Sequence, residues 1–448
     1  MGATIDRPLS AAELARMPEA RQEMATAGAQ GGATRFTFFA AFDGTFNDEG
    51  NLKLSGTALP TNVSQLRKQA HGADTPYLES RYYPGVGTGG DQGGVIHAGI
   101  WPTQAIEAAA NKAYVDLRRA ALDYLERPDA TPADLGVAVT GFSRGAASAI
   151  RFAQLVNERG LVGPAGEVVA PPGSIPVTAM ALIDPVARHV RMPMDIPPNV
   201  QGTVLSVIAQ HETRTDFRPL YYITDPRVAH VDHPGNHVGT GGGYDPHGTA
   251  ASVLEGVTGY FQRRGVAMAD VAPERRHDPQ SPQILYTEVW KTPRSGDLSE
   301  DDLGQRPMSW AHDPPGQGRV MVRPRMSPRH ADWLRLALAE LSPELKARGL
   351  DAEGCLRVAV ACVRSTAQRE AMLGPPRRFM LSADGQRVGV VHEVGVLHEV
   401  SVSQAMQTPT LEHLRLLEHE QQPAQAAEAG RAWTRRDEQE HTASALAR

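Results

Sequence analysis

The chain has 448 residues, of which 41% are hydrophobic and 21% charged, and its formal net charge is −6. This length allows one large hydrophobic core and a second region, because single cores stop growing at about 250–300 residues. The negative charge and the lack of a basic patch argue against a nucleic-acid partner, and no uninterrupted run of about 18 apolar residues predicts a membrane span.

Residues 1–34 are polar and rich in alanine and glycine, which predicts a mobile leader. The first residues lack both the basic leader and the apolar core of a secretory signal peptide. We therefore expect the protein to be made in the cytoplasm without a signal peptide. Any target outside the cytoplasm would then require a dedicated secretion machine.

Residues 35–42 are predicted to form the first strand, which runs into the turn Asp43-Gly44-Thr45. Asp43 either braces this turn through an Asx-type hydrogen bond or lines the site, and we assign it a lining role without catalysis. Some phosphatases carry two aspartates flanking one residue at such a strand end. Ala41 stands where the first of them would be, so phosphoryl-aspartate chemistry is not expected.

A glycine-rich stretch at residues 85–90 lacks both the Lys-Ser/Thr pair of a phosphate-binding loop and a complete dinucleotide fingerprint. We interpret it as a flexible loop beside the site, and we expect no cofactor. Further on, residues 103–127 have helical periodicity with no internal breaker, which predicts a long helix.

The most informative segment joins an apolar strand at 134–140 to a helix at 145–159 through Gly141-Phe142-Ser143-Arg144-Gly145. This Gly-x-Ser-x-Gly pattern is typical of a nucleophilic serine on a sharp turn. A side chain at either Gly141 or Gly145 would collide with the neighbouring strand or helix. Such a string also arises by chance in glycine-rich chains, but the flanking strand and helix favour Ser143 as the nucleophile.

A serine is a weak nucleophile on its own, so the pattern predicts an acid and a base further along the chain. Residues 175–183 form a nearly continuous apolar run of buried-strand length that ends at Asp184. We assign Asp184 as the acid, because the carboxyl ends of parallel strands converge at one edge of a sheet. A strand-terminal aspartate can also cap a turn, and Asp216 or Asp195 would be the substitute.

After a strand candidate at 204–210, a loop at 230–244 combines several histidines with a run of glycines. We assign His237 as the general base. The alternative is that it caps the loop, with His230, His233 and His247 as nearby rivals. A helix at 248–264 follows, and residues 35–271 form the predicted catalytic core.

The remaining sequence is predicted to add to this core. Residues 272–328 are rich in Pro, Asp, Arg and Ser and read as an insertion that is either a lid or a passive connection. Residues 329–422 are expected to form an accessory α+β region, with an amphipathic helix over 330–349. Residues 423–448 are predicted to be a flexible tail.

Two further patterns in the accessory region favour strands. Residues 356–363 and 379–391 read as strands, and the second is interrupted by Asp384-Gly385, a strong hairpin signal.

His-Glu pairs begin at His392 and His398, but their spacing differs from a zinc-binding His-Glu-x-x-His motif. We interpret them as solvated strand residues and expect no metal. Cys355 and Cys362 are poorly spaced for a disulfide.

Several motifs occur here in one order, and together they resemble a known family. They are the Phe-Asp-Gly-Thr strand end, the Gly-Phe-Ser-Arg-Gly-Ala turn, Asp-Pro-Val at 184–186, His-Glu-x-Arg-x-Asp-Phe at 211–217, and the Pro-Gly-x-His-x-x-x-Gly-Gly-Gly-Tyr loop. The family is the first class of type VI secretion phospholipase effectors, whose catalytic domain was long a domain of unknown function. The resemblance covers residues 35–264.

The resemblance implies an α/β-hydrolase fold, a mostly parallel sheet flanked by helices, and a triad of Ser143, Asp184 and His237 that cleaves acyl esters of membrane phospholipids. It also implies an antibacterial effector that reaches the periplasm of a target cell through a type VI delivery component. An immunity protein would protect the producing cell.

The chemistry expected of these residues is that of a serine esterase. His237 would take the proton of Ser143, and Asp184 would orient the imidazole. The backbone N–H of Arg144 would supply one oxyanion donor, and the turn containing Gly44 and Thr45 the second. The residues expected to line the site are Asp43, Gly141, Gly145 and Asp216.

Two alternatives remain at the level of the sequence. The first is a cytoplasmic carboxylesterase or thioesterase that acts on small soluble esters with the same triad. The second is a catalytically idle binding module that keeps the hydrolase fold.

Overall fold

The structure is a computed structural model of the chain. It describes residues 3–28, 34–94, 98, 101–222, 225, 227–243, 247–289, 307–310, 320–322, 328–408, 410, 413–414 and 416–417. Among the helices in these ranges, none is both long enough and apolar enough to cross a membrane. The chain forms two compact units, residues 1–222 with 227–322, and residues 323–448 with 223–226.

The first unit is built around a parallel sheet of six strands in the order β10-β8-β7-β4-β2-β3. Its four inner strands are buried along their whole length, as expected for a parallel sheet covered on both faces. This confirms the predicted α/β-hydrolase-like class. The strands are β2 (Phe36–Phe42), β3 (Leu78–Tyr83), β4 (Leu135–Phe142), β7 (Val177–Ile183), β8 (Val204–Ala209) and β10 (Val228–His233).

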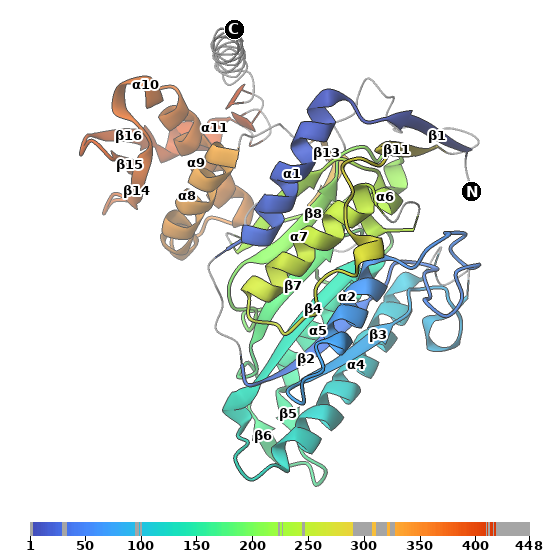
Figure 1. Ribbon diagram of the computed structural model, residues 1–448. Helices are drawn as coiled ribbons and strands as arrows, with labels where there is room; N and C mark the ends of the chain where they lie inside the picture. Colours follow the sequence, from blue (N-terminus) through green and yellow to red (C-terminus); the bar gives the residue numbers. More distant parts are fainter. Residues whose placement is uncertain are drawn as a thin grey trace, which may run out of the picture. The chain divides into compact units, whose positions relative to one another are not determined.

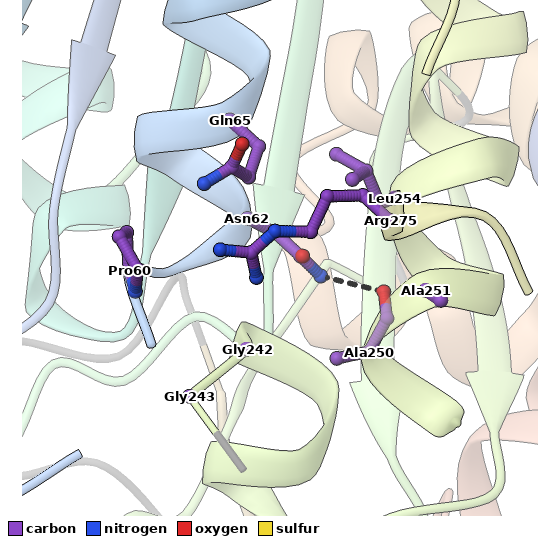
Figure 2. Close-up of a pocket in the computed structure, with 9 residues that line it drawn as sticks. All are labelled: Pro60, Asn62, Gln65, Gly242, Gly243, Ala250, Ala251, Leu254 and Arg275. Atoms are coloured by element: carbon purple, nitrogen blue, oxygen red, sulfur yellow. Dashed lines mark hydrogen bonds between the residues drawn. The ribbon is translucent and has the colours of Figure 1, made fainter. Parts of the chain in front are cut away.

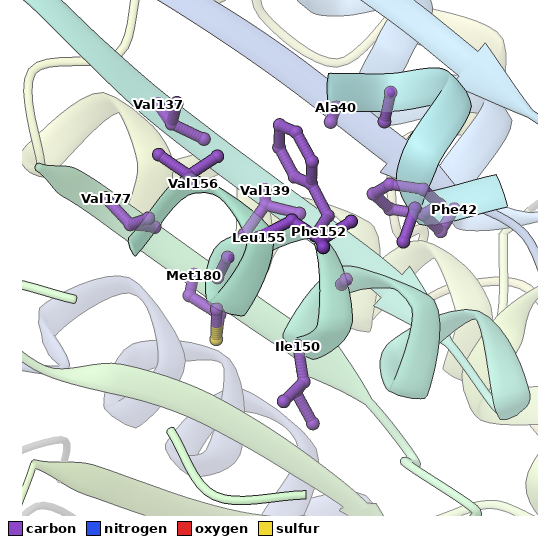
Figure 3. Packing of buried hydrophobic residues seen from close by; sticks show 14 of the residues in the cluster. Ala40, Phe42, Val137, Val139, Ile150, Phe152, Leu155, Val156, Val177 and Met180 are labelled. Carbon is purple, nitrogen blue, oxygen red and sulfur yellow. The ribbon is translucent and has the colours of Figure 1, made fainter. Parts of the chain in front are cut away.

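Helices cover the two faces of this sheet (Figure 1). One face carries α4 (Pro102–Leu125) and α5 (Arg144–Arg159), which pack on β2 and β4. Figure 3 shows Phe152 and Val156 of α5 against Val137 and Val139 of β4 within this apolar core. The other face carries α1 (Ala11–Thr26), α2 (Asn62–Gly72) and α7 (Thr249–Arg263) around a second core.

The N-terminal segment differs from the expected mobile leader. Strand β1 (Ala3–Pro8) pairs antiparallel with β11 (Ile284–Val289), and α1 starts with a capping box between Ser10 and Glu13. Met17, Ala20 and Met24 recur at helical spacing and are buried, and α1 packs against α7. The alanine-rich composition and Pro18 inside the helix obscured this apolar stripe in the sequence.

Shorter elements complete the first unit. Within the 272–328 region, β12 (Pro307–Trp310) pairs with β13 (Val320–Val322) and with β9 (Leu220–Tyr221). Most of the predicted insertion and the predicted tail lie outside the described residues. The remaining elements are β5 (Leu161–Val162), β6 (Val168–Ala170), α6 (His237–Gly241) and the 3₁₀ turns η1 (Gly90–Gln92), η2 (Pro132–Asp134), η3 (Thr215–Phe217) and η4 (Pro273–Arg275).

The second unit combines helices with a three-stranded antiparallel sheet. The hairpin predicted at Asp384-Gly385 is confirmed, since it joins β14 to β15. The elements are α8 (Pro328–Ala347), α9 (Ala352–Ala367), α10 (Glu370–Leu373), β14 (Pro376–Leu381), β15 (Arg387–His392), β16 (Leu397–Ser401) and α11 (Val402–Gln407).

Two expectations about this unit are wrong. Residues 356–363 lie inside α9 and not in a strand, because burial on the helix outweighs the preference of valine for strands. Glu393 and Glu399 are exposed as predicted, but His392 is buried. Its Nδ1 donates to the Gly374 carbonyl at 2.7 Å, and its Nε2 lies 2.7 Å from His398 Nδ1. Cys355 and Cys362 are free thiols in α9.

Candidate active site

Ser143 occupies the sharp turn between β4 and α5. Its backbone has φ +55° and ψ −126°, a conformation that non-glycine residues rarely adopt and that is held here by the surrounding structure. The Ser143 N–H donates to the Ile183 carbonyl at 3.0 Å, and its own carbonyl accepts from Ala146 N–H at 3.1 Å. The turn therefore holds Ser143 at the carboxyl end of the central strands.

The two glycines of the turn are required by close backbone packing. A Cβ on Gly145 would lie 2.3 Å from the Phe42 carbonyl oxygen, and one on Gly141 would lie 2.5 Å from the Gly145 carbonyl oxygen. Both distances are shorter than any real Cβ contact. The collision expected from the sequence is therefore confirmed at both positions.

Asp184 follows β7, the strand next to β4. Phe142 and Ile183 are register partners, so Ser143 and Asp184 leave neighbouring strands at the same level. The Asp184 side chain is completely buried, and its Oδ1 accepts from Ala209 N–H at 3.0 Å. Asp184 also has a positive φ, +39°, which turns the chain away from the strand direction.

His237 is the first residue of α6, and Asn236 caps this helix by accepting from Gly239 N–H at 2.7 Å. His237 Nδ1 lies 2.6 Å from Asp184 Oδ2, and both side chains are buried. Its ring packs 4.6 Å from the Phe142 ring and 4.7 Å from the Phe217 ring, centroid to centroid. Because Nδ1 faces the carboxylate, Nδ1 is assigned as the N–H donor and Nε2 as the free base.

The rival residues have other partners. His233 is buried, and burial lowers the pKa of its imidazole to about 3. Its Nδ1 bonds the Pro234 carbonyl and its Nε2 bonds Ser252. His230 accepts from Tyr222 N–H, and His247 bonds the Arg276 carbonyl. Asp195 is exposed. Asp216, also expected to line the site, forms an ion pair with Arg188.

A buried ion pair between Glu212 and Arg214 supports His237, and no role was predicted for either residue from the sequence. Glu212 is 1% exposed, and its carboxylate binds the Arg214 guanidinium at 2.8 and 2.7 Å. Glu212 Oε2 also accepts from the His237 backbone N–H at 3.2 Å. The Arg214 guanidinium lies 3.8 Å from the centre of the Phe217 ring, which in turn contacts the imidazole.

The N-terminal helix also contacts the histidine loop. Glu13 Oε1 lies 2.7 Å from His211 Nε2, and His211 Nδ1 accepts from Gly235 N–H at 3.0 Å. The Arg7 side chain binds Glu13 and is the main cause that lowers the pKa of the Glu13 carboxyl to about 2. Because Nδ1 accepts a hydrogen bond, the proton of the His211 imidazole lies on Nε2, which donates to the Glu13 carboxylate. Burial lowers the pKa of His211.

Asn62 of α2 secures the far end of α6. Its Nδ2 donates to the Ala250 carbonyl at 2.9 Å and to the Thr240 carbonyl at 3.1 Å. Figure 2 shows Asn62 in a small pocket between α2 and α7. The pocket is lined by Pro60, Asn62, Gln65, Gly242, Gly243, Ala250, Ala251, Leu254 and Arg275. It lies against the C-terminal turn of α6 and does not include the candidate triad.

The Asp43 turn is anchored by its own carboxylate. Asp43 Oδ1 accepts from Gly44 N–H, and Oδ2 accepts from the Thr61 and Tyr82 hydroxyls, each at 2.7 Å. Burial raises the pKa of the Asp43 carboxyl to about 6. Since the Gly44 N–H already has this acceptor, Thr45 is the better candidate in the turn for an oxyanion donor. Arg144 N–H lies in the first turn of α5, where helix N–H groups lack helical partners.

Comparisons with known proteins find distant structural likeness. No protein-family model matches the chain, and no curated protein matches it. One similar structure is the Tle1 effector bound to the VgrG spike from the Type 6 secretion system, with 21% identity and a TM-score of 0.35, covering 49% of this chain and 53% of that chain. Another is an uncharacterized protein from Pseudomonas aeruginosa, with 13% identity and a TM-score of 0.37, covering 81% of this chain and 57% of that chain. Structural similarity at these identities and TM-scores does not assign an activity to this chain.

Proposed function

We propose that the protein is a serine hydrolase that cleaves acyl esters of membrane phospholipids with Ser143, Asp184 and His237. The observation that carries this proposal is the buried contact between His237 Nδ1 and Asp184 Oδ2 at 2.6 Å, with Ser143 leaving the neighbouring strand at the same level as Asp184. An aspartate that fixes the imidazole tautomer leaves Nε2 free to take a proton from a serine hydroxyl.

In this mechanism, His237 Nε2 accepts the Ser143 proton as Oγ attacks the ester carbonyl. The negative oxygen of the tetrahedral intermediate receives hydrogen bonds from the N–H groups of Arg144 and Thr45. The imidazolium returns its proton to the leaving alcohol, and an acyl-serine remains. Water then attacks the acyl-serine with the same base, which releases the fatty acid and restores the hydroxyl.

A fluorophosphonate probe tests the nucleophile, because it labels only an activated serine. We expect the wild-type protein to be labelled at Ser143. A folded wild-type protein that resists labelling would support the idle binding module. Hydrolysis of phospholipid vesicles compared with short-chain soluble esters then tests the substrate class. Equal or faster turnover of the soluble ester would favour the carboxylesterase or thioesterase.

The effector role belongs to this proposal as well. It is supported by the order of the motifs along the chain, from the Phe-Asp-Gly-Thr turn to the glycine-rich histidine loop. The protein would be carried by a type VI delivery component to the periplasm of a target cell, and an immunity protein would block its site in the producer. Affinity purification from the producing cell tests this role, and recovery of the tagged protein with no stoichiometric partner would count against it.

A further inference from the structure

Three arginines near the candidate triad lie within electrostatic range of the Asp216 carboxylate, and one of them pairs with it. Arg144 directly follows Ser143, Arg188 lies four residues after Asp184, and Arg218 follows Phe217, whose ring contacts His237. Arg188 forms an ion pair with Asp216, the residue before Phe217. Arg144 and Arg188 therefore lie in the segments that follow β4 and β7 and carry Ser143 and Asp184, and Arg218 lies in the segment between β8 and β9 that contacts His237 through Phe217.

Arg144 is unusual because its side chain is partly buried and pairs with no carboxylate of the described residues. Its Nη1 donates to the Ala98 carbonyl. Within the part of the chain that the structure describes, no carboxylate lies within ion-pair distance of it. Burial, and then the positive charge of Arg188, lower the pKa of Arg144 to about 10. Buried charges are normally paired, so this environment favours an anion.

Arg218 gives an independent indication. Its Nε atom is buried and has no hydrogen-bond partner among the described residues. Burial lowers the pKa of its guanidinium, and the Asp216 carboxylate, which already binds Arg188, opposes this effect. A buried N–H without an acceptor is costly, and an oxygen of a bound ligand would satisfy it.

We infer that Arg144, Arg188 and Arg218 form a subsite that binds the phosphodiester group of a lipid while its acyl ester lies at Ser143. Guanidinium groups suit this ligand because their N–H donors match phosphate oxygens in pairs. This inference rests on the proposed function and extends it: the phosphate of the substrate, and not only its acyl chain, would be recognised. Free inorganic phosphate offers the same chemistry and is the alternative occupant.

The test compares Arg188→Gln with the wild type, because the Arg188 side chain is 42% exposed and its loss should not disturb the core. Arg218→Gln is the second variant. Arg119→Gln on α4 is the control, since its side chain is 60% exposed and pairs with Asp116. Each protein is assayed on a phospholipid and on diacylglycerol with the same acyl chains in identical detergent micelles. We expect Arg188→Gln to lose about tenfold in kcat/KM on the phospholipid alone.

Equal losses on both lipids, or no loss on the phospholipid, would overturn the inference. Calorimetric titration of the wild type with dimethyl phosphate and with inorganic phosphate measures binding to the subsite independently of ester hydrolysis. We expect dimethyl phosphate to bind and Arg188→Gln to weaken it. Binding of inorganic phosphate alone would also overturn the inference. Dimethyl phosphate binding in a protein that cleaves no ester would instead refute the proposed function and leave the subsite standing.

Discussion

The two halves of the candidate site are held in different ways. The serine turn is fixed by backbone: parallel strands, hydrogen bonds to Ile183 and glycines that touch neighbouring carbonyls. The histidine loop is fixed by polar side chains from elsewhere in the chain, including Glu212, Asn62 and Glu13 through His211. The nucleophile should therefore tolerate changes to side chains around it, whereas the base depends on a few buried polar groups.

Removal of the Ser143 hydroxyl should have the largest effect on activity. Ser143→Ala keeps the backbone of the turn, so we expect at least about a 10⁴-fold loss of ester turnover with a nearly unchanged melting temperature. Ester hydrolysis assays and thermal melting measure the two effects, and fluorophosphonate labelling should be lost together with the turnover. Ser174→Ala, at an exposed serine, is the matched control and should retain labelling. A large loss of stability in Ser143→Ala would indicate a structural role.

A methyl group in the serine turn should disrupt the part of the site that is held by backbone contacts. Gly145→Ala places a Cβ 2.3 Å from the Phe42 carbonyl oxygen, and we expect a loss of about 3 kcal/mol in the free energy of unfolding. Gly94→Ala is the control, because a Cβ there meets nothing within 4 Å. Chemical denaturation measures both. Equal stability of the two variants would contradict the close packing described for the turn.

Loss of the Glu212 charge should disrupt the histidine loop, which is held by buried polar side chains. Glu212→Gln removes the carboxylate that binds the buried Arg214 guanidinium, which we expect to cost about 3 kcal/mol and to slow the labelling of Ser143. The double variant Glu212→Gln with Arg214→Met removes both members of the ion pair and should recover part of the stability. Denaturation and labelling rates separate the effects, and wild-type behaviour of the single variant would contradict the support assigned to Glu212.

The contact of α1 with the histidine loop should have the smallest effect. Glu13→Gln weakens the bond to His211, and we expect about a threefold lower rate of Ser143 labelling. Glu19→Gln on the same helix is the control, because its side chain is 67% exposed. Identical rates in the two variants would argue that α1 does not position the loop.

The pH dependence of stability tests the contribution of the Glu13 carboxylate. The folded-state pKa of Glu13 is about 2, below its ordinary value of 4.5. The ionised carboxylate therefore stabilises the fold above about pH 4.5, and this contribution is lost as the pH falls toward 2. The difference in unfolding free energy between the wild type and Glu13→Gln should shrink over that interval. Denaturation at several pH values measures it, and a constant difference would contradict the assignment.

The sequence was informative about the sheet because each buried strand is a continuous apolar run. The strands ending at Ser143 and Asp184, and the helices around them, could be predicted from such runs and from helical periodicity. The positions of Asp184 and His237 followed from the rule that strand ends converge. Their hydrogen bond joins residues far apart in the chain, so its geometry needed coordinates.

The supports of the histidine loop could not be predicted for the same reason. Glu212 lies in a motif that the family resemblance contains, but nothing in its spacing indicates that its carboxylate accepts from His237 N–H. Asn62 and Glu13 act across long sequence separations and leave no local pattern. In α9, the valines favoured a strand locally, and only tertiary burial decides the helix.

The pairing of β1 with β11 and of α1 with α7 affects how the chain is made. Translation produces the N-terminal segment first, yet its partners lie beyond residue 248, and at about 5–20 residues per second they follow roughly 10 to 50 seconds later. Throughout this time the nascent protein carries the apolar stripe of α1 and the open edge of β1 without their native neighbours. Ribosome-associated chaperones that shield such surfaces would therefore meet β1 and α1 before the elements that cover them are made.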